Sequence, residues 1–126
     1  PIHSSAASDV YKRQLHISCW DVFEKQDNHQ TITKELCSIY SESIPIVSTG
    51  SVWNAVDAQF VLDQGAQAVG VARVALPHPD WASLVTDSTY NPKEAPFTPE
   101  ELRSADLSPT FVEYMRRWRG FVTDGR

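Results

Sequence analysis

The sequence predicts an α/β fold in which parallel strands alternate with helices. Two short apolar runs, Ile44–Val47 and Ala68–Val71, are separated by a helical pattern that ends at Gly65. Continuous apolar runs of this kind are typical of strands that are buried on both faces of a parallel sheet. A single intervening helix is the connection that neighbouring parallel strands require. We therefore expect a strand–helix–strand unit here, with Val56, Phe60 and Val61 on the buried face of the helix.

The preceding segment repeats this order. Leu15–Cys19 has the composition of a short strand, and we expect the segment 20–26 that follows it to be a loop. Residues 30–40 then predict a helix whose buried side carries three apolar residues, Ile32, Leu36 and Ile39. We expect this strand to be the third member of the same sheet.

After Trp81 the alternation of strands and helices ends. Residues 82–85 complete a short helix, and the polar, proline-containing segment 87–96 predicts a loop. Thr98 followed by Pro99 and two glutamates is a strong signal for a helix start. Ser108 and Pro109 repeat the signal before a last helix, 110–118. Its apolar stripe, which we expect to dock on the rest of the fold, consists of Phe111, Val112, Met115 and Trp118.

Small residues follow the ends of two neighbouring strands of the predicted sheet. Gly50 and Ser51 come after the first apolar run, and Ala72 and Arg73 come after the second. Small side chains let backbone N–H groups approach a ligand closely, and a helix N-terminus adds partial positive charge. An arginine there can hold an anion with two parallel hydrogen bonds. These four residues therefore predict a phosphate-binding site, which in (β/α)8 barrels is frequent after strands seven and eight.

Each of these residues also has a structural interpretation. Gly50 fits a turn, and Arg73 fits a surface ion pair, although the neighbouring loop favours phosphate for both. The segment Ser18–Asp21 can line the mouth of an active site, but we expect structural roles for it. Cys19 has no basic neighbour that would lower its pKa, so a reactive thiol is not predicted. We assign no catalytic residue and no metal ligand.

Three pieces of sequence carry a family resemblance: IPIVSTGSV, DQGAQAVGVAR and LPHPDW. Together they resemble the last two β/α units of the old yellow enzyme family, the FMN-dependent NADH:flavin oxidoreductases. The resemblance covers residues 15 to about 122, and its more specific part is Ala72-Arg73 followed by Pro79-Asp80-Trp81. Ala72 stands where the family usually has glycine. If the residue at this position contacts the phosphate only through its N–H group, alanine keeps that contact, provided that its φ is negative.

The resemblance implies a fold and a function. Residues 15–86 would form about strands six to eight of an FMN-binding TIM barrel, and residues 87–126 would form a loop and C-terminal helices that pack on it. The parent enzyme would bind FMN, take hydride from NADH or NADPH, and pass it to a small-molecule acceptor such as an activated alkene. The family's catalytic residues lie upstream, so this fragment would be inactive alone. The full-length enzyme is compatible with a homo-oligomer.

Two alternatives remain open. A non-redox phosphate-binding TIM barrel, such as a synthase or isomerase, would share the glycine loop, but Ala72-Arg73 with Pro79-Asp80-Trp81 counts against it. A stand-alone binding module is disfavoured, because a buried parallel sheet with unpaired edges is unstable.

Composition excludes several classes of protein. A net charge of −5 argues against nucleic acid as a partner, and the apolar runs are too short for a membrane span. The two cysteines form neither a CxxC pair nor a cluster with histidine, so we expect a cytoplasmic protein. Residues 1–14, PIHSSAASDVYKRQ, lack apolar periodicity and resemble a translated sequencing adapter. We expect this segment to be a non-native, disordered scar on the C-terminal remnant of a longer enzyme.

Overall fold

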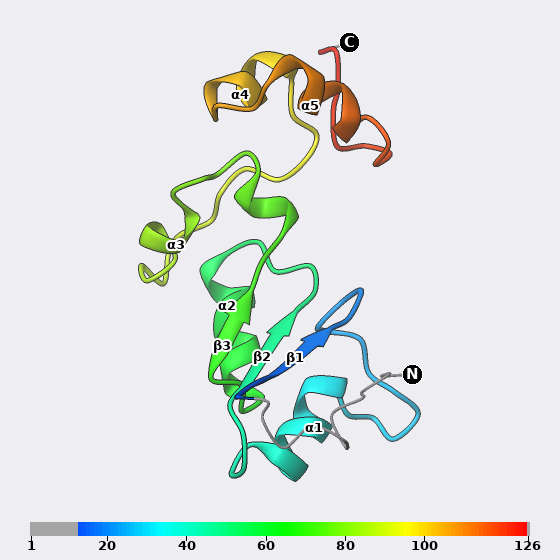
Figure 1. Cartoon of the computed structure of the whole chain (residues 1–126), viewed down its shortest axis with the longest axis vertical. Helices are drawn as coiled ribbons and strands as arrows, with labels where there is room; N and C mark the ends of the chain where they lie inside the picture. The colour runs from blue at the N-terminus through cyan, green and yellow to red at the C-terminus, as the bar shows by residue number, and fades with distance from the viewer. Residues whose placement is uncertain (1–12, 126) are drawn as a thin grey trace. The chain divides into compact units, whose positions relative to one another are not determined.

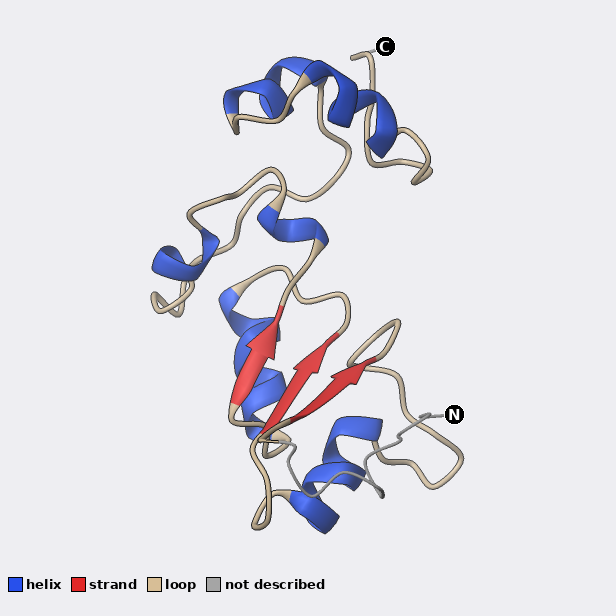
Figure 2. Cartoon of the chain, viewed as in Figure 1, coloured by secondary structure: helices blue, strands red, loops and turns tan. Residues whose placement is uncertain are grey.

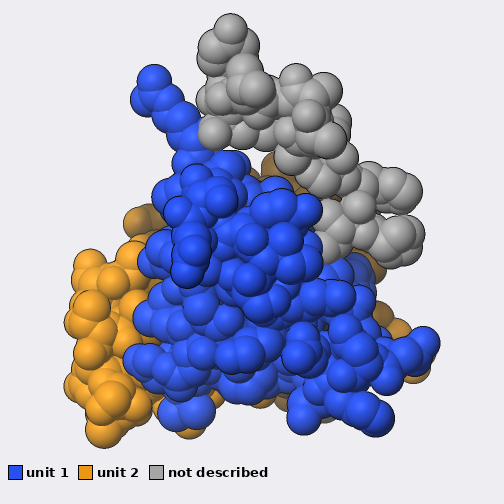
Figure 3. Space-filling view, turned by 90° about the horizontal axis from the view of Figure 1, so that it is seen from below, with its two compact units in different colours: residues 1–52, 56–71 blue, residues 53–55, 72–126 orange. Residues whose placement is uncertain are grey.

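The computed structural model describes residues 13–125, which divide into two compact units. The described part of unit 1 comprises residues 13–52 and 56–71, and that of unit 2 comprises residues 53–55 and 72–125 (Figure 3). The expected scar at residues 1–14 lies almost wholly outside the described residues. Within it, Arg13 and Gln14 are irregular and exposed. In the described part of the chain, no helix is long and apolar enough to span a membrane.

Unit 1 is built on a parallel three-stranded sheet in the order β1-β2-β3 (Figure 2). The strands are β1 (Leu15–Ser18), β2 (Ile46–Thr49) and β3 (Ala68–Gly70). Helix α1 (Ile32–Tyr40) connects the first two strands, and α2 (Ala55–Asp63) connects the second and third. The prediction of a parallel sheet with helical connections is therefore confirmed. Strand β2 begins two residues later than expected and continues through Ser48 and Thr49, which pair with neighbours on both sides.

The prediction that the strands are buried on both faces of the sheet is wrong for most of the sheet. The middle strand alternates, with Ile46 and Ser48 fully buried and Val47 and Thr49 half-buried. In β1 only Ile17 is buried, and β3 has no buried residue. The reason is that β1 and β3 each pair with one strand only within the described residues. Sheet edges are covered less than the centre.

Helix α1 turns a different face toward the sheet from the one expected. Its buried residues are Thr33 and Cys37, whereas Ile39 is 59% exposed. The Thr33 hydroxyl lies 2.7 Å from the Ser48 hydroxyl on β2, and this buried pair sets the rotation of the helix. The start of α1 is fixed locally, because the Thr31 side chain accepts a hydrogen bond from the Lys34 N–H.

Helix α2 buries Val61 as expected, but Val56 is 70% exposed. Five residues place Val56 about 140° around the helix from Val61, so the two cannot share one face. The inner positions are taken by Ala55 and Ala58. Phe60 lies at the border of the buried face, where its ring contacts Phe23, with 4.6 Å between the ring centroids.

Unit 2 has its own apolar core beneath two short helices, α4 (Pro99–Ser104) and α5 (Pro109–Met115), shown in Figure 1. The unit also contains a 3-10 helix, Arg73–Ala75, and the short helix α3 (Trp81–Leu84). The residues of its core are Phe97, Leu102, Val112, Met115 and Phe121.

Both predicted helix starts in unit 2 are confirmed. Thr98 forms a capping box with Glu101, and the Ser108 side chain caps α5. The predicted stripe on the last helix is only half correct, since Phe111 and Trp118 are partly exposed while Val112 and Met115 are buried. Because α5 ends at Met115, Trp118 lies beyond the helical spacing on which the stripe was based.

Candidate functional site

Gly50 and Ser51 lie where β2 ends, at the carboxyl edge of the sheet in unit 1. Thr49, the last residue of β2, pairs with Gly70, the last residue of β3. The two strands therefore end side by side, as Figure 2 shows. Carboxyl ends of neighbouring parallel strands are the usual position of ligand sites in α/β folds. The predicted loop at Gly50 and Ser51 is thus at the expected edge.

Gly50 is required by the close approach of the chain after β1. A Cβ atom at this position would lie 2.5 Å from the backbone oxygen of Cys19 and 3.0 Å from its sulfur. Two backbone hydrogen bonds hold the approach in place, from the Cys19 N–H to the Thr49 oxygen and from the Val22 N–H to the Gly50 oxygen. The interpretation of Gly50 as a structural glycine therefore has a physical basis, whether or not the loop binds a ligand.

Gly70 is a second required glycine, which sequence reasoning did not single out. A Cβ atom there would collide with the hydroxyl of Thr49 on the paired strand. Its position inside an apolar run was the available signal, because an isolated glycine in a strand often marks a close approach of neighbouring groups.

Ser51 has a positive φ of 58°, which is uncommon for a residue with a side chain. Its hydroxyl donates to the backbone oxygen of Trp20, with 2.9 Å between the two oxygens. Within residues 13–125, the backbone N–H groups of Ser51 and Val52 have no acceptor. The loop thus uses its side chain to bind the neighbouring segment and leaves two backbone donors for another partner. Such donors suit an anion.

Ala72 and Arg73 belong to unit 2, whereas Gly50 and Ser51 belong to unit 1. Ala72 has a φ of −130°, so the condition of a negative φ, under which alanine keeps a backbone contact here, is met. The Arg73 side chain is exposed, and it forms no ion pair within the described part of the chain. Arg73 opens a 3-10 helix of only three residues. The expected contribution of a helix dipole is therefore small here, since a single turn carries little of it.

The surroundings of both thiols disfavour the thiolate form. Burial raises the pKa of Cys19, and the negative charge of Asp21 raises it further. Burial likewise raises the pKa of Cys37. A raised pKa leaves less thiolate at neutral pH, so neither residue has the character of a nucleophile. In the described part of the chain, no group of three or more histidine, cysteine or carboxylate side chains is placed to hold a metal ion.

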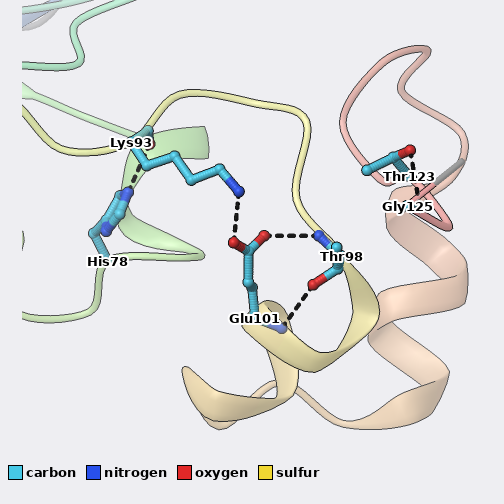
Figure 4. A network of polar contacts seen from close by, with 6 residues as sticks. All are labelled: His78, Lys93, Thr98, Glu101, Thr123 and Gly125. Carbon is cyan, nitrogen blue, oxygen red and sulfur yellow. Dashed lines mark hydrogen bonds and ion pairs between the residues drawn. The ribbon is translucent and has the colours of Figure 1, made fainter.

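A polar network in unit 2 is structural (Figure 4). The Lys93 ammonium group contacts the Glu101 carboxylate at 2.5 Å, and His78 Nε2 lies 2.8 Å from the Lys93 backbone oxygen. The same carboxylate accepts from the Thr98 N–H as part of the capping box. These bonds hold the loop before Phe97 against α4. Because the polar groups bond to one another, the network has a structural role.

Comparison with known proteins identifies the family. Residues 20–117 match the family described as Dihydrouridine synthase (Dus), a family of FMN-dependent TIM-barrel enzymes. The chain is also 32% identical to the NADH:fumarate oxidoreductase of Klebsiella pneumoniae (strain 342). That alignment covers 67% of this chain and 10% of the relative, so the chain spans about a tenth of the relative's length. The flavin-dependent TIM-barrel group predicted from the sequence is confirmed at this level, and the chain belongs to the dihydrouridine synthase family.

Proposed function

We propose that this chain supplies the phosphate end of the FMN site in an enzyme that reduces carbon–carbon double bonds conjugated to a carbonyl group. One observation carries the proposal: within residues 13–125, the N–H groups of Ser51 and Val52 lack acceptors where β2 ends beside β3. An anion bound at such an edge needs backbone donors of this kind. Membership of an FMN-dependent family makes the flavin phosphate the best candidate.

The residues present fit a phosphate group. Gly50 keeps the end of β2 close to the backbone of Cys19, which fixes the positions of the two donors that follow. Arg73 is an exposed cation that comes three residues after β3 and is proposed to add a charged contact. The N–H of Ala72 is proposed as a further donor. When bound, FMN would supply hydride transfer between NADH or NADPH and the acceptor.

The chemistry of the acceptor is inferred from the two matches. A dihydrouridine synthase saturates one carbon–carbon double bond of the uracil ring, and that double bond is conjugated to a carbonyl group. Fumarate likewise has a double bond conjugated to its carboxyl groups. An activated alkene is therefore the acceptor class that both names share. It is also the class that resemblance to the old yellow enzyme family predicts, and an ene-reductase of that type is our proposal for the parent enzyme.

The proposed place in the parent fold follows from the strand order. We assign β1, β2 and β3 to strands six, seven and eight of the barrel, because the loops that follow strands seven and eight hold phosphate in many barrels. In such an enzyme, residues of this chain bind and orient the cofactor. Hydride delivery and protonation of the acceptor would depend on residues outside it. A homo-oligomeric parent is compatible with this assignment.

The test is made in an exchange enzyme, defined as the Klebsiella NADH:fumarate oxidoreductase with its matching segment replaced by this chain. A charge-assisted contact to phosphate contributes roughly 1.5–3 kcal/mol, so Arg73→Ala should weaken FMN binding about 10- to 150-fold. Lysine should restore only part of the loss, because it lacks the planar fork of arginine. Riboflavin, which has no phosphate, should bind nearly unchanged.

The matched control is Arg103→Ala, which removes an exposed arginine from α4. This control should leave both flavin affinities unchanged. Equal losses for FMN and riboflavin on Arg73→Ala would assign the arginine to the fold, and no loss would remove it from the site. An exchange enzyme that binds phosphate esters but no flavin would favour the non-redox barrel instead.

A further inference from the structure

Trp20 is the most exposed large apolar residue of the described chain, although its backbone is held firmly. The residue is 84% exposed, and its indole takes part in no ring contact or hydrogen bond within residues 13–125. Leaving a tryptophan in water forgoes the large stabilisation that burial of its ring provides. Because no described residue stacks on the ring or bonds to it, the indole is free to contact a ligand.

The segment around Trp20 is anchored on both sides. The Ser51 hydroxyl donates to the Trp20 backbone oxygen at 2.9 Å, and the Cys19 N–H donates to the Thr49 oxygen at 3.0 Å. After Trp20, the Asp21 carboxylate accepts from the Phe23 N–H, which closes a tight turn. The indole is therefore carried by an ordered backbone that is bonded to the end of β2. Ordering the backbone in advance lowers the entropic cost of binding a ligand.

The position of Trp20 connects it to the candidate phosphate loop. The residue that bonds its backbone oxygen, Ser51, is also one of the two residues whose N–H groups lack acceptors in the described part of the chain. A ligand whose phosphate is bound by those donors would extend from the same edge of the sheet that carries the indole. Aromatic side chains at such edges recognise flat conjugated rings by stacking, largely regardless of ring substituents.

We propose that Trp20 is a ligand-binding residue whose indole stacks on a planar conjugated ring bound at the carboxyl edge of β1 and β2. The inference rests on the proposed function, since it takes the phosphate loop as the neighbouring part of the same site. Two ligands of the proposed reaction contain such a ring. FMN has its isoalloxazine ring, and a cyclic acceptor such as uridine has its base. The shared chemistry is the flat conjugated ring, and the experiment separates the two sources.

The test compares Trp20→Ala and Trp20→Phe in the exchange enzyme. If the indole stacks on the flavin, the alanine variant should bind FMN and riboflavin roughly 5- to 150-fold more weakly, by the same factor for both. Phenylalanine should restore most of the affinity. Fluorescence of the bound flavin should rise in the alanine variant, because a stacked indole quenches it. If the indole stacks on the acceptor, flavin affinity should stay constant while binding of uridine weakens and binding of fumarate, which has no ring, does not.

The matched control is Trp118→Ala, which removes another partly exposed tryptophan whose ring already packs edge-on against Tyr114, with 5.2 Å between the ring centroids. Unchanged flavin affinity, flavin fluorescence and uridine affinity in Trp20→Ala would overturn the inference. A loss for FMN alone would also overturn it, because it would indicate a phosphate contact. Failure of the proposed function has a different signature, since the exchange enzyme with Trp20 intact would then bind no flavin, and the inference would fall with it.

Discussion

Replacing Gly50 with alanine tests the contact that shapes the candidate site. The added Cβ atom would lie 2.5 Å from the Cys19 backbone oxygen, whereas real Cβ atoms essentially never approach within 3.0 Å. The two groups must therefore separate by at least 0.5 Å. A backbone oxygen cannot rotate away as the end of a long side chain can, so the ends of β1 and β2 must move apart.

The cost of that movement follows from the hydrogen bonds across the contact. The Cys19 N–H donates to the Thr49 oxygen at 3.0 Å, and the Val22 N–H donates to the Gly50 oxygen at 3.1 Å. Each bond contributes roughly 0.5–1.5 kcal/mol net, so losing both costs about 1–3 kcal/mol. The free energy of local opening at these two amides should fall by that amount. Their hydrogen exchange should accelerate about 5- to 150-fold.

Hydrogen exchange read at individual amides is the assay, and Gly120→Ala is the matched control. Gly120 also has a positive φ, of 81°, but a Cβ atom there meets nothing within 4 Å. Its substitution should therefore strain only its own backbone and leave exchange at Cys19 and Val22 unchanged. Unchanged protection of both amides in Gly50→Ala would refute the contact and, with it, the structural role of Gly50.

Two further predictions concern buried and paired polar groups. Thr33→Val should destabilise unit 1 by about 1–3 kcal/mol in urea unfolding, because the buried Ser48 hydroxyl loses its partner, and adding Ser48→Ala should recover part of the loss. Strictly additive effects of the two substitutions would contradict this pairing. Hydrogen bonds from Lys93 and then from the Thr98 N–H hold the pKa of Glu101 below its usual range. The stability that this carboxylate contributes is therefore present above its ordinary pKa and is lost as the pH falls through the lower folded value. Lys93→Met should raise that pKa in an NMR titration, and an unchanged midpoint would show that the ion pair does not form in solution.

The order of strands and helices was predictable because its signals are local. A serine or threonine N-cap followed by proline fixed the starts of α4 and α5 at Thr98 and Ser108. The apolar runs likewise marked β2 and β3. Each of these signals acts over a few residues, so no knowledge of the tertiary structure was needed.

The faces of the helices depended on distant partners and were predicted less well. Helix α1 buries Thr33 rather than Ile39, because Thr33 finds the Ser48 hydroxyl on a strand that comes later in the chain. An apolar pattern cannot reveal a buried pair of hydroxyl groups. The same limit explains Val56, which is apolar but lies away from the face that Val61 fixes.

In the candidate site, too, local features were predicted from the sequence and features that depend on distant residues were not. Gly50 and Ser51 were predicted from their place after an apolar run, and they do lie at the carboxyl edge of the sheet. The demand for glycine at position 50 comes from Cys19, which is distant in sequence. Trp20 was expected to have a structural role, and its exposed indole became apparent only once the strands were paired. Arg73 remains a proposal based on its position in the chain.

The structural and ligand-binding interpretations of the Gly50 loop are compatible, because they use different groups. The Gly50 carbonyl and the Ser51 hydroxyl are directed to the segment after β1, where they bond Val22 and Trp20. The N–H groups of Ser51 and Val52 are left without acceptors in the described chain. Packing against the segment after β1 therefore uses the Gly50 carbonyl and the Ser51 side chain and leaves the two backbone donors for another partner. A loop whose shape is fixed by one set of groups can present the other set to an anion without reorganising, which is the condition for tight binding.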